Sequence, residues 1–180
     1  MTKNKYVSAT EKWLESIVIG LNLCPFAKRE WVKNRVRLQL SKASTTADLL
    51  QGLTREIILL DEHKSIETTL LIHPFVLTEF YDYNQFLADA DNLLIELDRD
   101  GIYQIASMHP HYQFTGTTAE DLENYTNRSP YPLLHLIRED SIEVAINNYK
   151  DADKIPQKNI ELLESMGFKK IQSMLKSCKQ

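Results

Sequence analysis

The chain has 180 residues, a length that suits one domain with a sizeable buried core. Apolar residues make up 43% and charged residues 26%, as in ordinary globular proteins and unlike disordered chains. The formal net charge of −4 argues against general binding of nucleic acid but leaves room for a local anion site. No window approaches the roughly 18 apolar residues that a membrane span needs, so we expect no membrane association.

The N-terminal residues and the cysteines indicate the compartment. Residues 1–10 are polar and contain no apolar segment of the secretory type. Cys24 and Cys178 lie too far apart in the sequence to form a zinc-type pair. We therefore expect a cytoplasmic protein with reduced thiols.

The first part of the chain alternates helical and strand patterns. Residues 8–11 match a capping box, which predicts that a helix begins at Ser8. Pro25 is expected to be the first residue of a second, short helix, and Thr45 to cap a third, longer one. The predicted elements of this part are helices over 8–21, 26–33 and 45–60 and strands over 36–40 and 68–73.

The second part continues the alternation and ends in helices. Asp82 is expected to cap the next helix, and Gly101 to follow its C-terminal end in a left-handed conformation. Ser141 is expected to cap a further helix, and Pro156 to open the one after it. The predicted elements are helices over 82–98, 142–149, 157–165 and 169–176, a helical turn over 120–125, and strands over 102–108 and 133–138.

Strands that alternate with long helices indicate the α/β class. We expect one layered domain over residues 1–180, because no linker is long enough to divide it. Its sheet is predicted to be mixed, with about four strands and at least one parallel β–α–β unit. Helices should pack on this sheet, and the N- and C-terminal segments should also be helical.

Three histidines follow the ends of predicted strands. If the helix over 82–98 is a right-handed crossover, the strands that end at His73 and His109 run parallel and end at one edge of the sheet. Open parallel sheets bind ligands beyond this edge. His109 and His111 form a His-x-His pattern and, with His73, make a candidate site for a divalent transition metal. Alternatively, these are polar residues where the chain leaves the sheet and Pro110 makes the turn.

The segment over 124–132 is dense in hydrogen-bonding side chains and is stiffened by two prolines. Arg128 offers a planar guanidinium that suits a carboxylate or a phosphate. The segment therefore predicts one wall of a binding site. The alternative is an ordered loop in which Arg128 pairs with Asp121 or Glu123.

Cys24 directly precedes Pro25. If Pro25 is the first helical residue, Cys24 is the N-cap, and the helix dipole lowers the pKa of its thiol with help from Lys28 and Arg29. A nucleophilic cysteine beside a histidine would follow from this. The alternative is a small, buried apolar residue.

Several ordered stretches are recognisable together, and on them the chain resembles the bacterial family catalogued as domain of unknown function 1415. The resemblance covers nearly the whole chain and implies a small stand-alone domain without indicating an activity. The family pattern often has an acidic residue where His111 stands, which moves the emphasis to the other candidates, Cys24, His73, His109, Gln113, Asn127, Arg128 and His135. The stretches that carry the resemblance are 18–27, 67–74, 109–114, 123–132 and 134–139.

The leading hypothesis is a small enzyme that acts on an anionic small molecule. His109 would serve as acid and base, Cys24 as nucleophile, and His73 as a further catalytic group or a metal ligand. The second hypothesis is a non-catalytic ligand-binding or protein-interaction module that uses the same loop as a recognition surface. The expected ligand-binding residues are Gln113, Asn127, Arg128, Ser129, His135 and Arg138, and the expected metal ligands are His73, His109 and His111.

Overall fold

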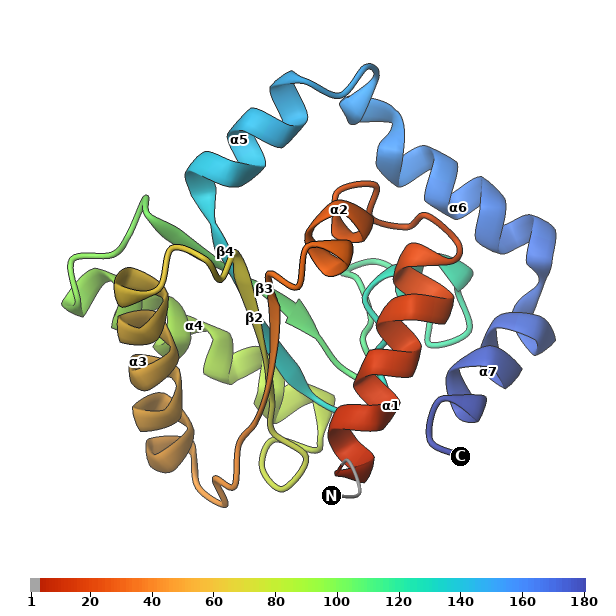
Figure 1. The fold of residues 1–180 in the computed structure, drawn as a ribbon. Helices are drawn as coiled ribbons and strands as arrows, with labels where there is room; N and C mark the ends of the chain where they lie inside the picture. The colour runs from red at the N-terminus through yellow and green to blue at the C-terminus, as the bar shows by residue number, and fades with distance from the viewer. Residues whose placement is uncertain (1–3) are drawn as a thin grey trace.

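The computed structural model describes residues 4–180; residues 1–3, part of the polar N-terminal stretch, lie outside the described residues. A four-stranded sheet in the order β1-β2-β4-β3 forms the centre of the molecule (Figure 1). β1 and β2 are parallel, and β4 is antiparallel to both of its neighbours. The predicted mixed sheet with a parallel pair is therefore confirmed. The strands are β1 (Val36–Leu40), β2 (Thr68–Ile72), β3 (Tyr103–Met108) and β4 (Leu133–Arg138).

Two long helices connect the strands that run in the same direction. α3 (Thr46–Glu62) leads from β1 to its parallel neighbour β2, and α4 (Phe80–Glu96) leads from β2 to β3. β2 and β3 both run antiparallel to β4, which lies between them, so they point the same way. The C-terminal ends of β1, β2 and β3 consequently lie on one edge of the sheet, which we call the carboxyl edge.

Helices cover both faces of the sheet and make three layers (Figure 1). α3 and α4 pack on one face, where Leu71 of β2 points, and the adjacent Leu70 belongs to the core on the other face. The second face is covered by α1 (Lys5–Trp13), the π-helical turn η1 (Leu14–Ile19), α6 (Ile155–Met166) and α7 (Phe168–Ser177). The remaining elements are α2 (Ala27–Val32), α5 (Glu139–Asn147) and the 3₁₀ turns η2 (Leu122–Thr126) and η3 (Ala152–Lys154).

The predicted apolar stripe of α3 is the centre of the first core. Leu49, Leu53, Ile57 and Leu60 are all at most 1% exposed. Burial of one such side chain stabilises a fold by about 2 kcal/mol relative to an exposed one. This stripe fixes which face of α3 turns away from solvent and therefore which residues flank the sheet.

Several helix boundaries differ from the sequence prediction. α1 begins at Lys5 rather than Ser8, because Asn4 caps it by accepting a hydrogen bond from the Tyr6 N–H (3.0 Å). The predicted Thr45 cap of α3 is confirmed, with the Asp48 N–H donating to Thr45 Oγ1 (3.1 Å).

The later helices also begin before the predicted caps. Glu79 is the N-cap of α4, which leaves Asp82 in the first turn, where the helix dipole favours an acid. α5 begins at Glu139 directly after β4, so Ser141 lies within it. The C-cap of α4 is Leu97, so Asp98 (φ 53°) is the left-handed residue directly after the helix. Gly101 (φ 74°) has the predicted left-handed conformation, but three residues further along. Among residues 4–180, no helix combines the length and the apolar character that crossing a membrane requires.

Candidate functional site

The structure brings His73 and His109 together at the carboxyl edge. His73 follows β2 and His109 follows β3, and both side chains are fully buried. Both rings contact the ring of Tyr83 from α4, with centroid distances of 5.8 Å for His73 and 5.1 Å for His109. The parallel direction of β2 and β3 places them there, as the sequence predicted.

Both histidines fasten the turn that follows β2. His73 Nδ1–H donates to the Val76 carbonyl (3.1 Å), and His109 Nε2–H donates to the Leu77 carbonyl (3.3 Å). His109 Nδ1 accepts from the backbone N–H of His111 (3.0 Å), so both of its ring nitrogens are engaged. His73 Nε2, by contrast, is buried with no hydrogen-bond partner within the described chain.

Burial keeps these two rings neutral. Removal from water lowers the pKa of both His73 and His109 from the ordinary 6.5 to about 4. A general acid or base works best with a pKa near the operating pH and needs contact with the reacting group. The acid–base role of His109 therefore stays a prediction that its burial and its two hydrogen bonds do not support.

The third member of the predicted metal set lies at the surface. His111 is exposed, and its ring centroid is 5.9 Å from that of His109. Within residues 4–180, no group of three or more histidine, cysteine, aspartate or glutamate side chains is placed to hold a metal ion.

Arg128 is used to hold its own loop. Its guanidinium donates to the carbonyls of Tyr112 (Nε, 3.2 Å) and Ala119 (Nη2, 2.7 Å) and lies 4.5 Å from the centre of the Tyr125 ring. The side chain is largely buried. The structure thus favours the ordered-loop alternative, with backbone carbonyls in place of the acidic partners that were considered.

The other polar residues of this region also bond within the protein. Asn127 Nδ2 donates to the Ser107 carbonyl (3.1 Å), and Ser129 Oγ donates to the Tyr131 carbonyl (2.7 Å). Gln113 Nε2 donates to a carbonyl of the turn that follows it. These contacts stabilise the loop beside β3 and account for its density of polar side chains.

Arg138 and His135 lie away from the carboxyl edge. Arg138 ends β4 and pairs in register with Tyr103, the first residue of β3, so it lies on the opposite edge of the sheet. There it donates to the Leu60 carbonyl (2.6 Å) and the Tyr103 hydroxyl (3.0 Å). Arg138, which was expected to bind a ligand together with Arg128, therefore lies on the edge opposite Arg128, because β4 runs antiparallel to its neighbours. His135 lies within β4 next to Thr68 Oγ1 (2.7 Å), and burial lowers its pKa to about 4.

Cys24 does not have the environment that the sequence predicted. The N-cap of α2 is Phe26, so Pro25 precedes the helix and Cys24 is not a cap. Burial raises the pKa of the Cys24 thiol and outweighs the lowering by the backbone N–H groups of the next turn. Cys24 packs against the apolar core on the second face of the sheet, and the groups that affect its thiol are Phe26 and Ala27 rather than the histidines.

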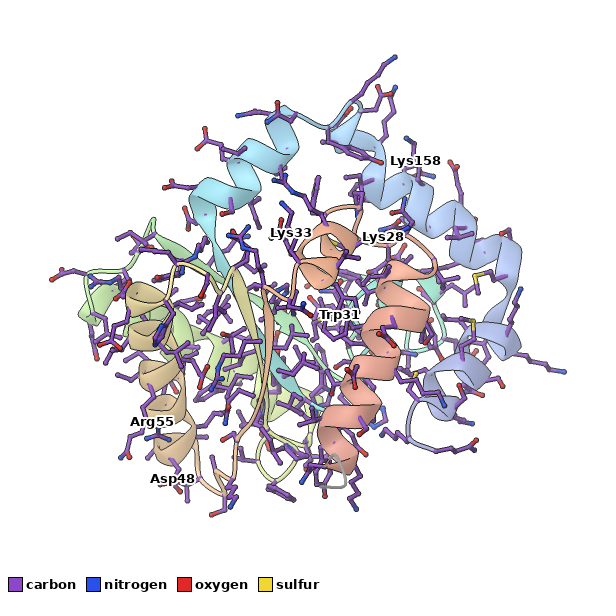
Figure 2. All side chains as sticks on the ribbon, viewed as in Figure 1. Lys28, Trp31, Lys33, Asp48, Arg55 and Lys158 are labelled. Atoms are coloured by element: carbon purple, nitrogen blue, oxygen red, sulfur yellow. The ribbon has the colours of Figure 1, made fainter. Side chains whose placement is uncertain are left out.

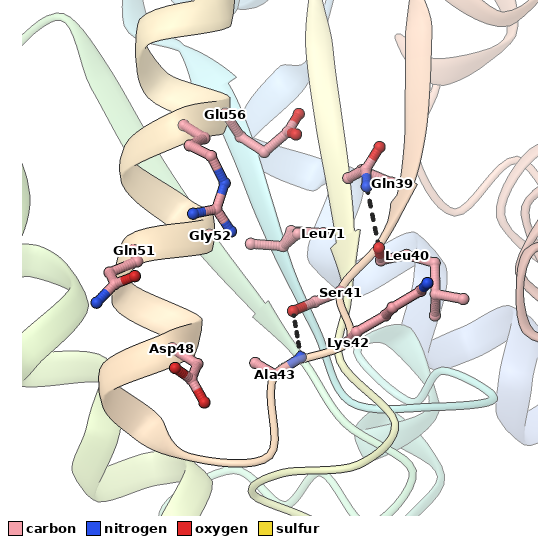
Figure 3. Close-up of a pocket in the computed structure, with 11 residues that line it drawn as sticks. Gln39, Leu40, Ser41, Lys42, Ala43, Asp48, Gln51, Gly52, Glu56 and Leu71 are labelled. Atoms are coloured by element: carbon pink, nitrogen blue, oxygen red, sulfur yellow. Dashed lines mark hydrogen bonds between the residues drawn. The ribbon is translucent and has the colours of Figure 1, made fainter.

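An open polar hollow lies at the same edge, next to the C-terminal end of β1. It has a volume of about 410 Å³ and lies between the end of β1 and the first half of α3 (Figure 3). It is lined by Gln39, Leu40, Ser41, Lys42, Ala43, Asp48, Gln51, Gly52, Arg55, Glu56 and Leu71.

Gly52 forms part of the floor of this hollow. A glycine in the middle of a helix costs up to about 1 kcal/mol relative to alanine. A Cβ at this position would have Arg55 Nη2 (3.7 Å) and Ser41 Oγ (3.8 Å) as its nearest neighbours, which is ordinary contact. No close packing therefore requires glycine, and its missing side chain keeps the hollow open. An isolated glycine inside the helical pattern was the available sequence signal.

The charges around the hollow are only partly neutralised. Glu56 is held by Arg37, whose Nε and Nη2 donate to its two carboxylate oxygens at 2.7 Å and 3.2 Å. Arg55 forms no ion pair with any residue in the described range 4–180. Its guanidinium reaches back over Gly52 toward Ser41. Arg55 is thus an exposed cation at the floor of an open hollow.

These features define a three-layer α/β domain with a solvent-open polar hollow at the carboxyl edge of its parallel strand pair. The chain belongs to the family described as "Protein of unknown function (DUF1415)", whose model matches residues 5–173. The resemblance that the ordered motifs indicated is confirmed. Neither the curated proteins nor the solved structures contain a significant match to the chain.

Proposed function

We propose that the protein binds a small anionic molecule in the hollow between β1 and α3. The observation that carries this proposal is the convergence of the Arg55 guanidinium and the Ser41 hydroxyl over the bare backbone of Gly52. A guanidinium presents parallel N–H donors that match a carboxylate or phosphate. With no ion pair of its own among residues 4–180, Arg55 is available for such a partner.

Backbone hydrogen bonds position Ser41 as a second hydrogen-bond donor to the anion. The Ser41 N–H donates to the Ile72 carbonyl (2.7 Å), which continues the parallel pairing of β1 and β2 by one residue. Ser41 Oγ accepts a hydrogen bond from the Ala43 N–H (3.1 Å). One of the two lone pairs of the hydroxyl oxygen is thereby engaged, while the hydroxyl hydrogen is left to donate into the hollow.

The location agrees with the usual place of ligands in open sheets that contain parallel strands. Such ligands bind beyond the C-terminal ends of the strands. Binding is favoured over catalysis, since the nearby histidines are buried and neutral and the Cys24 thiol has a raised pKa. We further propose a cytoplasmic location, which two free cysteines support because thiols persist in reducing compartments.

Titration of ¹⁵N-labelled protein with inorganic phosphate and with malonate tests the proposal. The amide signals of Ser41 and Gly52 should shift saturably, with a dissociation constant of about 1 mM, as expected for few contacts at an open site. Arg55→Gln should remove saturation. The control is Arg29→Gln, which makes the same charge change at another exposed arginine, one that lies on α2 beside Glu30 and should leave the titration unchanged. Figure 2 shows that α2, with Lys28 and Lys33, lies across the sheet from Asp48 and Arg55.

A second variant tests the hollow itself. Gly52→Leu should fill the space above the helix without meeting backbone, because only the ends of Arg55 and Ser41 side chains lie near the new Cβ. We expect a folded protein that no longer responds to either anion. Saturable shifts that persist in both Arg55→Gln and Gly52→Leu would place the anion elsewhere and refute the proposal.

A further inference from the structure

We infer that the ligand of this hollow is a zwitterion that carries an ammonium group at the end opposite its anionic group. The inference rests on the proposed anion site at Arg55. The observation behind it is that Asp48, an acidic residue of α3, lines the same hollow as Arg55. The chemical class is therefore a short amino acid with separated charges, in which the carboxylate meets Arg55 and the ammonium meets Asp48.

Helix geometry places the two charges on one face. Asp48 and Arg55 are seven residues apart in α3, which brings them to nearly the same angular position, with their Cα atoms about 10 Å apart along the axis. Gly52 lies between them on that face, one turn after Asp48. The face therefore has an acid at one end, a cation at the other, and bare backbone between them.

Asp48 keeps acceptor capacity for a ligand. Its carboxylate accepts one side-chain hydrogen bond, from Thr45 Oγ1–H to Oδ2 (2.8 Å). An ionised carboxylate offers about four lone-pair sites, so this capping contact leaves Oδ1 free to accept from an ammonium. Asp48 and Arg55 form no ion pair with each other in the described chain, so each is left to pair with a ligand.

The other charged side chains around the hollow, those of Glu56 and Lys42, do not form a second pair of accessible opposite charges. Glu56 is neutralised by Arg37 through two hydrogen bonds. Lys42 extends along Leu40 on the side away from α3, as Figure 3 shows. The accessible opposite charges that face each other across Gly52 are those of Asp48 and Arg55.

Three probes of equal chain length test the inference: valerate, 5-aminovalerate and pentylamine. We expect 5-aminovalerate to bind about three-fold tighter than valerate, as an added exposed ion pair typically contributes, and pentylamine to show no saturation. Asp48→Asn should remove the preference for 5-aminovalerate and leave valerate binding unchanged. Asp89→Asn, the same charge change at an exposed position of α4, is the matched control and should preserve the preference.

The outcomes separate this inference from the proposed function. Failure of valerate to bind in an Arg55-dependent manner would overturn the anion site and the zwitterion together. Arg55-dependent binding of valerate with no preference for 5-aminovalerate would overturn the zwitterion and leave the anion site standing. Equal weakening of both probes by Asp48→Asn would show that Asp48 acts by capping α3, and would also overturn the zwitterion.

Discussion

Acid should destabilise this fold steeply, and His73 and His109 should account for much of the effect. Both side chains are fully buried, and both have a pKa lowered to about 4 from 6.5. The unfolded chain therefore binds protons on these rings at a higher pH than the folded protein does. The stability that the neutral rings confer is complete above pH 6.5 and is lost as the pH falls from 6.5 toward 4.

The magnitude follows from the size of the shift. A difference of one pKa unit corresponds to about 1.4 kcal/mol, so each ring should lose about 3 kcal/mol of stabilising free energy between pH 7 and pH 4. The two rings together should lose on the order of 6 kcal/mol, which is comparable with the whole free energy of unfolding of a typical domain. Protonated His73 would also place an Nε2–H donor at a buried point where the described chain offers no acceptor.

The assay is urea unfolding of the native protein and of His73→Asn at several pH values between 7 and 4.5. Asparagine keeps a donor near the position of Nδ1, from which Val76 accepts, but does not titrate. The variant should lose less stability on acidification than the native protein, by about 2.5 kcal/mol at pH 4.5. His63→Asn is the control, because His63 is exposed. An unchanged pH dependence in His73→Asn would refute the argument.

Three further substitutions test the packing around the site. Gly52→Ala should raise the free energy of unfolding by about 0.5–1 kcal/mol in urea titrations, since the new methyl makes only ordinary contacts, and a loss would contradict the open floor. Arg37→Ala should lower it by about 3 kcal/mol, because the nearly buried Glu56 carboxylate loses both donors; an effect below 1 kcal/mol would show the pair to be solvated. Arg128→Lys should cost about 2 kcal/mol through lost carbonyl bonds and ring contact, without changing anion titrations at Ser41.

Local patterns were sufficient to predict most elements of the fold. The apolar stripe of α3 appears directly in the sequence, and so does the alternation that brings Val36 and Leu38 of β1 against the core on the second face, because periodicity reflects which side chains pack together. Strand order does not follow from local patterns. β4 inserts between β2 and β3 in the antiparallel direction, and this direction places Arg138 on the edge opposite Arg128. Only the pairing of distant segments determines such a placement.

The sequence predicts that His73 and His109 lie at one edge of the sheet, but it does not predict that their rings are buried. Strand direction alone brings His73 and His109 to one edge. The exposure of their rings depends on Tyr83 of α4 and on the turn over 74–78, which both pack against the histidines. These contacts are tertiary, so no local sequence pattern reveals them. Arg55 could not be predicted as a site residue, because a charged residue on the polar side of a helix has no local sequence sign that it borders a hollow.

The buried histidines and the open hollow are connected through one strand end. The Ser41 N–H donates to the carbonyl of Ile72, and the next residue, His73, is fixed by its ring bond to Val76 and by its N–H bond to the Pro132 carbonyl (3.0 Å). The histidine therefore holds the end of β2 on which Ser41 rests, although its ring does not line the hollow. The histidines that rigidify this edge are buried and neutral, whereas the two charged residues proposed to contact the ligand, Asp48 and Arg55, are exposed on the neighbouring helix. This difference follows from solvation. A charged side chain that binds a ligand is costly to bury while the site is empty, whereas the hydrogen bonds of a neutral group that holds the backbone are strongest where water is excluded.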